Sequence, residues 1–436
     1  MSYLLYLVGV VLFILGVAAS IGLHEMGHLI PGKLYNVKIT QYFIGFGRTI
    51  WSRQRGETEY GLKAVPLGGY VKLVGMLPPG PDQDPEVVQS RPTGMFSQLI
   101  SDARAAEYEH VSPHDHGRLF YQLPWWKKVV IMGSGVATNL VLAFLLYALV
   151  FMGYGVQAPN LTVGDVSQCV QAVRVTDAPR ACATTDPLSP AARAGLQKGD
   201  VLATLNGVAI HNYDQFREAI RANGSGVVTI GIVRNGRPIT LKPVHTEVNL
   251  VPSDTNPDQS VKAGFLGISP ESTRQQQSIG YVFSAMRDST DHVLSTLAHM
   301  PQRVYHVARA AVGLEQRDPN GPMSVVGAGR ISGEVIQDQA VPLGDRLMSL
   351  VLLLAGLNLF LGLVNLVPLP PFDGGGIATT LVDAVRRGFA RLRRRPDPGA
   401  LDSAKLLPVT YLGAALILVI SVVLIYADIV APVRLS

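Results

Sequence analysis

The sequence predicts a polytopic α-helical membrane protein with four transmembrane helices, which also carries a small α+β domain and a region of β-hairpins. Only 16% of the 436 residues are charged, whereas 48% are hydrophobic. Residues 1–23, 129–156, 347–372 and 406–427 contain no Asp, Glu, Lys, Arg or His. Each stretch has the roughly 20 residues that a helix needs to cross the hydrocarbon core. One such stretch could be a buried core helix, but four in one chain favour membrane spans.

The first span is expected over residues 1–30. A cleaved signal peptide is the alternative interpretation, but the apolar run has no basic residues before it and no convincing small-residue cleavage site. The run continues directly into SIGLHEMGHLIPGK, residues 20–33. We therefore expect a retained transmembrane helix with a motif at its end.

That motif has the HExxH spacing, with His24, Glu25 and His28. On a helix, positions i and i+4 share a face, so His24 and His28 can bind one metal ion. Zinc lowers the pKa of a bound water to about 7, and Glu25 is placed to take a proton from it. Histidines that only snorkel to the interface are the alternative, but ionisable residues at a span end are costly and usually functional. The motif predicts one Zn²⁺ per chain, with Glu25 as the catalytic residue.

Residues 36–75 contain short β-rich runs separated by glycines and predict membrane-associated β-hairpins, either a small cytoplasmic sheet or a re-entrant loop. Residues 76–128 predict a cytoplasmic loop with an amphipathic helix around MFSQLISDARAAEYE. HVSPHDHG contains His110, His114 and His116 in this loop. A metal cluster needs fixed geometry, so we expect these three histidines to be solvated.

After the second span, residues 129–156, a domain is expected over residues 160–246. Its AGLQKGDVLATLNG stretch resembles a PDZ domain. Such domains bind extended peptides by strand addition, and a β-rich spacer without a ligand is the alternative. Cys169 and Cys182 are the chain's two cysteines, and an oxidising compartment would favour a disulfide between them, with two free thiols as the alternative. Residues 247–346 predict a linker with amphipathic helices on the outer membrane face.

The third span is expected over residues 347–376 and the fourth over residues 406–427. The third ends in NLVPLPPFDGGG, where prolines break the helix and glycines let the backbone bend. A catalytic zinc normally has three protein ligands, and Asp373 is the first acidic residue after this span. Nominal alternatives are Glu57, Glu59 and the histidines of residues 110–116, none of which is expected on a helix.

The basic residues of this chain, whose net charge is +5, cluster beside the spans. Lys127 and Lys128 precede the second span, and six arginines lie between the third and fourth spans. Since positive residues near span ends stay in the cytoplasm, both termini and the PDZ-like domain are predicted outside the cell membrane, with residues 31–128 and 374–405 inside. The charge is thus explained by topology and membrane lipid, with no nucleic-acid partner.

Together, HEMGH, NLVPLPPFDGG, the LGGYVKLVGM loop and the PDZ-like domain resemble the site-2 protease family of intramembrane zinc metalloproteases, with its bacterial envelope-stress branch closest. The resemblance implies that His24, His28 and Asp373 bind zinc and that Glu25 is the catalytic base. Asn365, in the NxxPxP pattern, would help to hold the substrate backbone. The hairpins would be re-entrant and pair with an unwound substrate strand.

Two positions depart from the family pattern: Gly376 replaces a histidine, and Ser134 replaces a proline in GSGVATN, where Asn139 is kept. Neither is a predicted ligand. The predicted function is regulated intramembrane proteolysis of single-span membrane proteins, such as anti-sigma factors or signal-peptide remnants. A membrane PDZ scaffold or chaperone without proteolytic activity is the alternative, which has no need of a base beside metal ligands.

Overall fold

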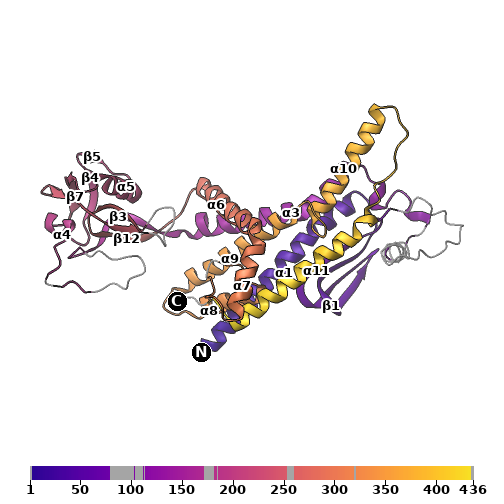
Figure 1. The fold of residues 1–436 in the computed structure, drawn as a ribbon, viewed down its shortest axis with the longest axis horizontal. Helices are drawn as coiled ribbons and strands as arrows, with labels where there is room; N and C mark the ends of the chain where they lie inside the picture. Colours follow the sequence, from indigo (N-terminus) through magenta and orange to yellow (C-terminus); the bar gives the residue numbers. More distant parts are fainter. Residues whose placement is uncertain are drawn as a thin grey trace. The chain divides into compact units, whose positions relative to one another are not determined.

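A computed structural model describes residues 2–78, 113–170, 185–252, 260–318 and 321–433, with residues 103, 111 and 181–183 between these ranges. The helix expected near residues 95–109 lies almost wholly outside the described residues, as does His110. The chain divides into two compact units. We call Met1–Tyr154 with Ser278–Ser436 the membrane unit, and Gly155–Gln277 the β-rich unit (Figure 1).

Four helices of the membrane unit are long and apolar enough to cross a membrane, which confirms the predicted number of spans among the described residues. They are α1 (Ser2–Leu34), α3 (Trp125–Ala148), α9 (Leu343–Asn365) and α11 (Leu407–Val430). A π-helical turn, Leu149–Tyr154, extends α3. α1 packs on α3, α8 and α9, so the helix that carries HExxH has protein on several sides.

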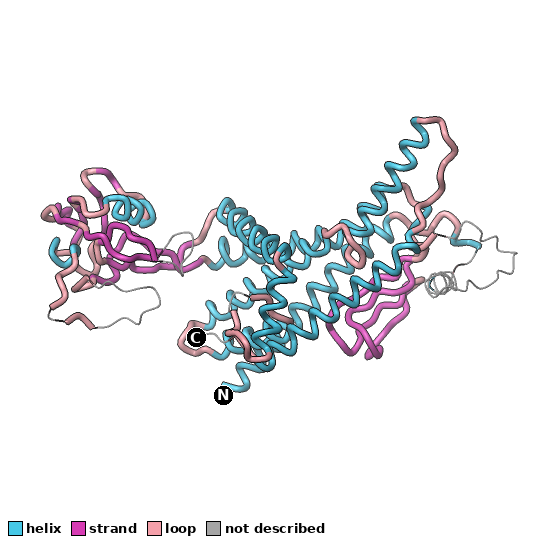
Figure 2. The backbone as a smooth tube through the Cα atoms, viewed as in Figure 1, coloured by secondary structure: helices cyan, strands magenta, loops and turns pink. Residues whose placement is uncertain are grey.

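The β-hairpin of the membrane unit comprises β1 (Ile39–Arg55) and β2 (Thr58–Leu73) and lies beside the helices (Figure 2). Two hairpins were expected here, but the structure has one long hairpin that folds back on itself. Tyr42 of β1 pairs with both Tyr60 and Val71 of β2. Gly45 and Gly47 have φ of 92° and 84°, which side-chain-bearing residues rarely adopt, and they allow the bend between the two halves of β1.

The folding back of the hairpin places residues 69–73 of β2 at one edge of the sheet formed by β1 and β2. Residues 39–44 of β1 lie between residues 59–62 and residues 69–73 of β2, so the second of these segments pairs on one side only among the described strands. Ile39, Tyr42 and Leu73 are buried against Leu29 of α1 and Ile131 of α3. The β2 edge is thereby held beside the ends of α1 and α3.

The predicted third span, residues 347–376, is too long at its end. α9 ends at Asn365, and α10 (Asp373–Leu392) begins after a turn that contains Pro368, Pro370 and Pro371. Proline lacks the amide hydrogen that a helix interior needs, so the spanning helix stops before this turn. The sequence did not predict α10. The other described helices of this unit include α6 (Ile279–Ala298), α7 (Met300–Ala311) and α8 (Val325–Gln337), and the short turn Ser403–Leu406 precedes α11.

The β-rich unit is larger than the predicted 160–246 domain because β12 (Ile268–Gln275) pairs with β3 (Val156–Val166). Residues 247–277, expected to be linker, therefore belong to this unit. Its six-stranded sheet has the order β12-β3-β4-β7-β8, with β5 beside β4. The remaining strands of the sheet are β4 (Val201–Leu205), β5 (Val208–Ala209), β7 (Ile230–Arg234) and β8 (Arg237–Thr240).

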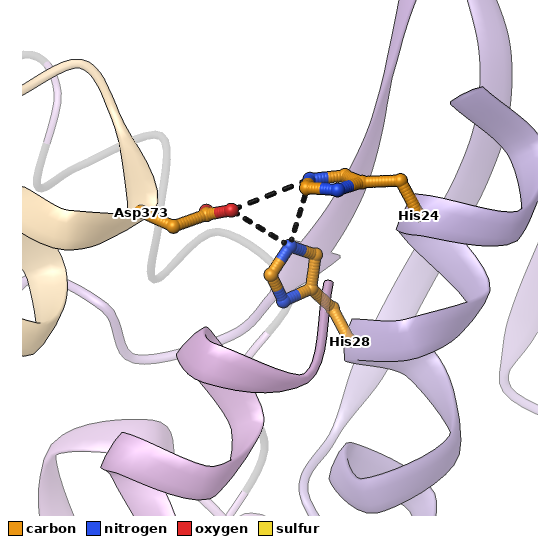
Figure 3. A group of neighbouring side chains, drawn as sticks. All are labelled: His24, His28 and Asp373. Atoms are coloured by element: carbon orange, nitrogen blue, oxygen red, sulfur yellow. Dashed lines mark hydrogen bonds and ion pairs between the residues drawn. The ribbon is translucent and has the colours of Figure 1, made fainter. Parts of the chain in front are cut away.

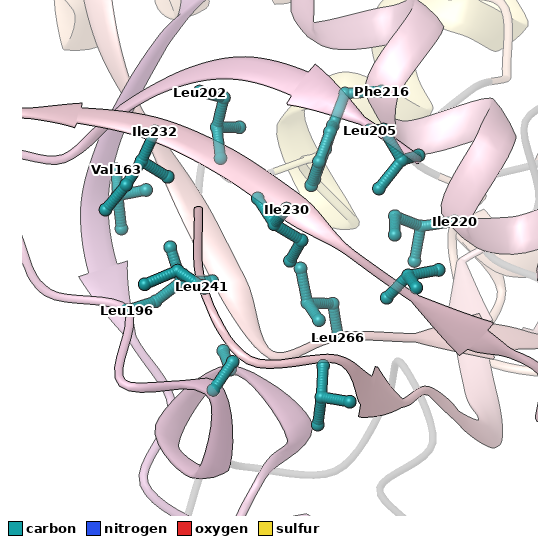
Figure 4. Packing of buried hydrophobic residues seen from close by; sticks show 14 of the residues in the cluster. Val163, Leu196, Leu202, Leu205, Phe216, Ile220, Ile230, Ile232, Leu241 and Leu266 are labelled. Carbon is teal, nitrogen blue, oxygen red and sulfur yellow. The ribbon is translucent and has the colours of Figure 1, made fainter. Parts of the chain in front are cut away.

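Among its described residues, the β-rich unit also has two smaller sheets and two helices. β10 (Glu247–Pro252) pairs with β11 (Ser260–Phe265), and β6 (Val227–Val228) pairs with β9 (Val244–His245). The helices are α4 (Pro190–Ala194) and α5 (Tyr213–Asn223). A core that includes Leu202, Phe216 and Ile230 fills the space between sheet and helix (Figure 4). Cys169 and Cys182 are joined as a disulfide in this unit.

The Asp200 carboxylate of the β-rich unit is 1% exposed and pairs with Arg234. Arg234 donates from Nε to Oδ1 and from Nη2 to Oδ2, both at 2.7 Å, and the Gln197 amide donates to Oδ2 at 2.8 Å. Burial by itself raises the pKa of Asp200, but these hydrogen bonds lower it more, so the pKa lies below its ordinary value. The ionised pair thus stabilises the fold above the ordinary pKa of about 3.9, and that contribution is lost as pH falls through the lowered pKa.

We expect Arg234→Ala to lower the free energy of unfolding of residues 155–277 by about 3 kcal/mol at neutral pH, since it strips a buried carboxylate of its cation. The difference from wild type should shrink below about pH 4, because Asp200 becomes protonated. Urea unfolding across this pH range measures both. Arg217→Ala removes an exposed pair with Asp214 and should cost less than about 0.5 kcal/mol. Equal losses of unfolding free energy in the two variants would contradict a special stabilising role for the buried Asp200–Arg234 pair.

Candidate metal centre

The last turns of α1 bring the two histidines of HExxH together. His24 and His28 are one helical turn apart, and their Nε2 atoms lie 3.3 Å from each other. His28 is 6% exposed, so it is nearly enclosed by protein. The i, i+4 spacing of the sequence thus produces one shared ligand face on α1.

Asp373 meets these histidines from α10. It is the first residue of that helix, and its Oδ2 lies 3.3 Å from Nε2 of His24 and 3.3 Å from Nε2 of His28 (Figure 3). The proline-rich turn after α9 brings this carboxylate back onto α1. The structure therefore gathers all three predicted ligands, and these side chains form a cluster that could hold a metal ion among the described residues.

Zinc fits the arrangement of these three atoms. Ligand atoms about 2.0–2.1 Å from the centre of a regular tetrahedron lie about 3.3–3.4 Å from one another. The three distances of 3.3 Å match one face of that tetrahedron. Asp373 Oδ2 is also buried, and the Nε2 atoms of both histidines face it. Two imidazoles and one carboxylate form a donor set that catalytic zinc sites use, with a fourth position left for water or substrate.

The carboxyl group of Asp373, which follows the third span, is suited to act as an anionic ligand. It would bind a metal ion as the carboxylate anion. An ionised carboxylate facing two imidazole nitrogens is favourable for a bound cation.

α3 supports the two histidines from behind. The Ile131 carbonyl lies 2.7 Å from His28 Nδ1, and the Asn139 amide lies 3.1 Å from His24 Nδ1. Gly135 lies between Ile131 and Asn139 on α3, close to both imidazole rings. A Cβ added at Gly135 would clash with His28 Nε2 and would lie 2.9 Å from His24 Cε1. Any side chain at position 135 would displace the imidazoles. Glycine is therefore required for α3 to approach the site.

Glu25 lines a cavity of about 580 Å³, and the three predicted ligands line the same cavity. The cavity wall includes residues 68–71 of β2, and Gly69 lies against Glu25. Asn139 and Asn365 line the same cavity. Glu25 is adjacent to His24 in sequence and shares this space, so it is placed to exchange a proton with a water molecule there.

The nominal alternatives to Asp373 lie elsewhere. Glu57 accepts hydrogen bonds from Arg118 at 2.7 and 2.6 Å, and Glu59 lies in β2, paired with residues of β1. His114 is in a short 3₁₀ turn and His116 follows it, and neither belongs to the described metal cluster. In the sequence, Asn139 stands out only as a kept motif position, and no role is predicted for Gly135. The signal available for Asn139 was an amide within an otherwise apolar span.

Comparisons with known proteins agree with this chemistry. The sequence matches peptidase family M50 over residues 12–395. It is 31% identical to the zinc metalloprotease Rip1 of Mycobacterium tuberculosis, covering 99% of this chain and 100% of that protein. It is 28% identical to Rip1 of Mycolicibacterium smegmatis, with 98% of each chain covered. Metalloprotease MmpA of Caulobacter vibrioides is 26% identical, with 88% of each chain covered.

Proposed function

This chain belongs to peptidase family M50, a family of proteases, and from that premise we propose that it cuts single-span membrane proteins within, or at the cytoplasmic edge of, their spans. It is a multi-pass membrane protein and a zinc metalloprotease by family. The observation that carries the proposal is the cluster of His24, His28 and Asp373 beside Glu25. The two histidines lie on α1, which is long enough to cross a membrane, and Asp373 begins α10 shortly after the spanning helix α9.

The cavity residues have distinct roles in the proposed reaction. Zinc held by His24, His28 and Asp373 would polarise the scissile carbonyl and activate a water molecule near neutral pH. Glu25 would take the proton of that water and pass it to the leaving amine. Asn365, from the end of α9, would hold the substrate backbone in the same cavity.

The edge of β2 supplies a way to hold an unwound substrate. A helical peptide bond is shielded by its own hydrogen bonds, so a substrate helix must open before it can be cut. Residues 69–73 pair with β1 on one side, and residues 68–71 line the cavity beside Glu25. An extended substrate segment could add to this edge by backbone hydrogen bonds, which would place its carbonyl near the metal centre.

The β-rich unit would act as a PDZ-like filter on the substrate's outer part. β12 stands at the end of the strand order, so it offers an edge to a peptide end. The positive residues beside the spans favour an orientation with this unit and both termini outside the cell membrane and the zinc site near the cytoplasmic side. Anti-sigma factors and signal-peptide remnants are the substrates that this orientation and the family resemblance suggest. A PDZ scaffold without proteolysis is not favoured, since a scaffold does not need a general base such as Glu25 beside predicted metal ligands.

Comparison of membrane proteomes from cells with wild type or Glu25→Gln tests the proposal. We expect at least one single-span protein, already trimmed on its outer side, to accumulate in the variant. With wild type, its new end should map within its span or a few residues from the cytoplasmic edge. Cuts that map only to soluble loops would contradict intramembrane cleavage, and identical proteomes would leave the scaffold as the better explanation.

A further inference from the structure

α3 contacts the two predicted histidine ligands through one face. Ile131, Gly135 and Asn139 are spaced four residues apart, so they lie in a row along the helix. The first and last of them contact the Nδ1 atoms of His28 and His24, respectively. The opposite ring nitrogens, both Nε2, converge on Asp373.

This arrangement sets the tautomer of each imidazole. An imidazole that offers Nε2 to a cation carries its proton on Nδ1 and needs an acceptor there. The Ile131 carbonyl is such an acceptor for His28, at 2.7 Å. His24 needs an equivalent acceptor, and the Asn139 side chain is the group found at its Nδ1.

The oxygen of Asn139 is available for this role. Asn139 is 1% exposed, and its Oδ1 is buried without a hydrogen-bond partner among the residues that the structure describes. The two ends of an amide are assigned from the surrounding hydrogen bonds, and a half-turn of the side chain exchanges them. After that turn the oxygen would face the Nδ1–H of His24. This rotation would also give Asn139 Oδ1 a hydrogen-bond donor, and a buried polar atom without a partner is costly.

We propose that Asn139 is a positioning residue for His24: its side-chain oxygen accepts the Nδ1–H and holds Nε2 toward Asp373. It does for His24 what the Ile131 carbonyl does for His28. Gly135 makes this possible, because a larger residue there would hold α3 too far from α1 for the amide to reach the ring. The inference rests on zinc binding at the site of the proposed function.

Two substitutions of similar size separate hydrogen bonding from packing. Asn139→Leu fills the space but has no acceptor, and we expect it to weaken zinc binding about 10- to 100-fold, as for other partners of ligand histidines. Asn139→Asp keeps an acceptor oxygen and should bind zinc within a few-fold of wild type. Affinity is measured on the purified full-length protein by competition with a chromophoric zinc chelator. The absorption spectrum of the Co²⁺-loaded protein should change in the leucine variant and stay close to wild type in the aspartate variant.

Tyr147→Phe is the control variant, since it removes a different polar group of α3, the hydroxyl that contacts Ser289 away from the site. It should bind zinc as wild type does. Wild-type affinity in Asn139→Leu, or an equal loss in Asn139→Asp, would overturn the proposal, the latter because it would make the amide nitrogen the interacting atom. If the leucine variant does not fold, the affinity of the aspartate variant decides. These measurements need no substrate, so a wild type that binds zinc but cuts nothing would refute the proposed function alone.

Discussion

Replacement of Asp373 by alanine is expected to weaken zinc binding by about 10²- to 10³-fold. A protein zinc site is worth roughly 10–16 kcal/mol, so one ligand of several accounts for about 3–4 kcal/mol. Asp373 supplies the only carboxylate among the three clustered ligands, and its Oδ2 faces both histidine nitrogens. Its loss leaves two imidazoles, which hold the ion less tightly and with less defined geometry.

To test for weaker zinc binding in Asp373→Ala, the purified protein is dialysed against a chelator. Its zinc content is then measured by elemental analysis. Wild type should retain about one ion per chain. Asp397→Ala is a suitable control, since it removes an acidic residue from the segment between α10 and α11 that pairs with Arg387 instead. Stoichiometric zinc in Asp373→Ala would rule out the assigned ligand set. Loss of zinc in the control would indicate a general effect of acidic residues in this segment.

The change of Glu25 to glutamine is expected to separate zinc binding from catalysis. Glutamine has nearly the same size and can still form hydrogen bonds, but it cannot accept a proton from water. Turnover should fall about 10²- to 10⁴-fold, the usual contribution of a general base, while bound zinc stays at the wild-type level. Glu25 faces the cavity without being one of the three clustered ligands, which is why the two properties should separate.

The measurement uses the purified protein in lipid nanodiscs with a single-span substrate found by the proteome comparison. Product formation is followed by mass spectrometry, and zinc is determined on the same samples. Turnover within about tenfold of wild type would refute the role of Glu25 as base. If both activity and zinc were lost, Glu25 would instead be needed to assemble the metal site.

The sequence determined those features that depend on neighbouring residues. Runs without charge set the four spans, because crossing a membrane requires a local length of apolar helix. The HExxH spacing placed His24 and His28 on one helical face for the same local reason. The prolines after Asn365 indicated a break in the third helix, but the predicted span still continued to residue 376 and did not reveal that α10 begins at Asp373.

Apart from the meeting of Asp373 with His24 and His28, which the family resemblance implied, the tertiary structure decided which distant segments meet. The folding back of β1 and β2 puts a strand edge beside Glu25, and the packing of α3 places Gly135 and Asn139 against the histidines. β12 belongs to the β-rich unit because it pairs with β3. Since β3 lies more than a hundred residues earlier in the chain, local sequence patterns did not predict this pairing. No periodicity or motif encodes such contacts, since they arise from the shapes of packed surfaces rather than from local spacing. The sequence therefore specified the candidate chemistry, and the packing of α1, α3 and α10 decided the geometry in which that chemistry could operate.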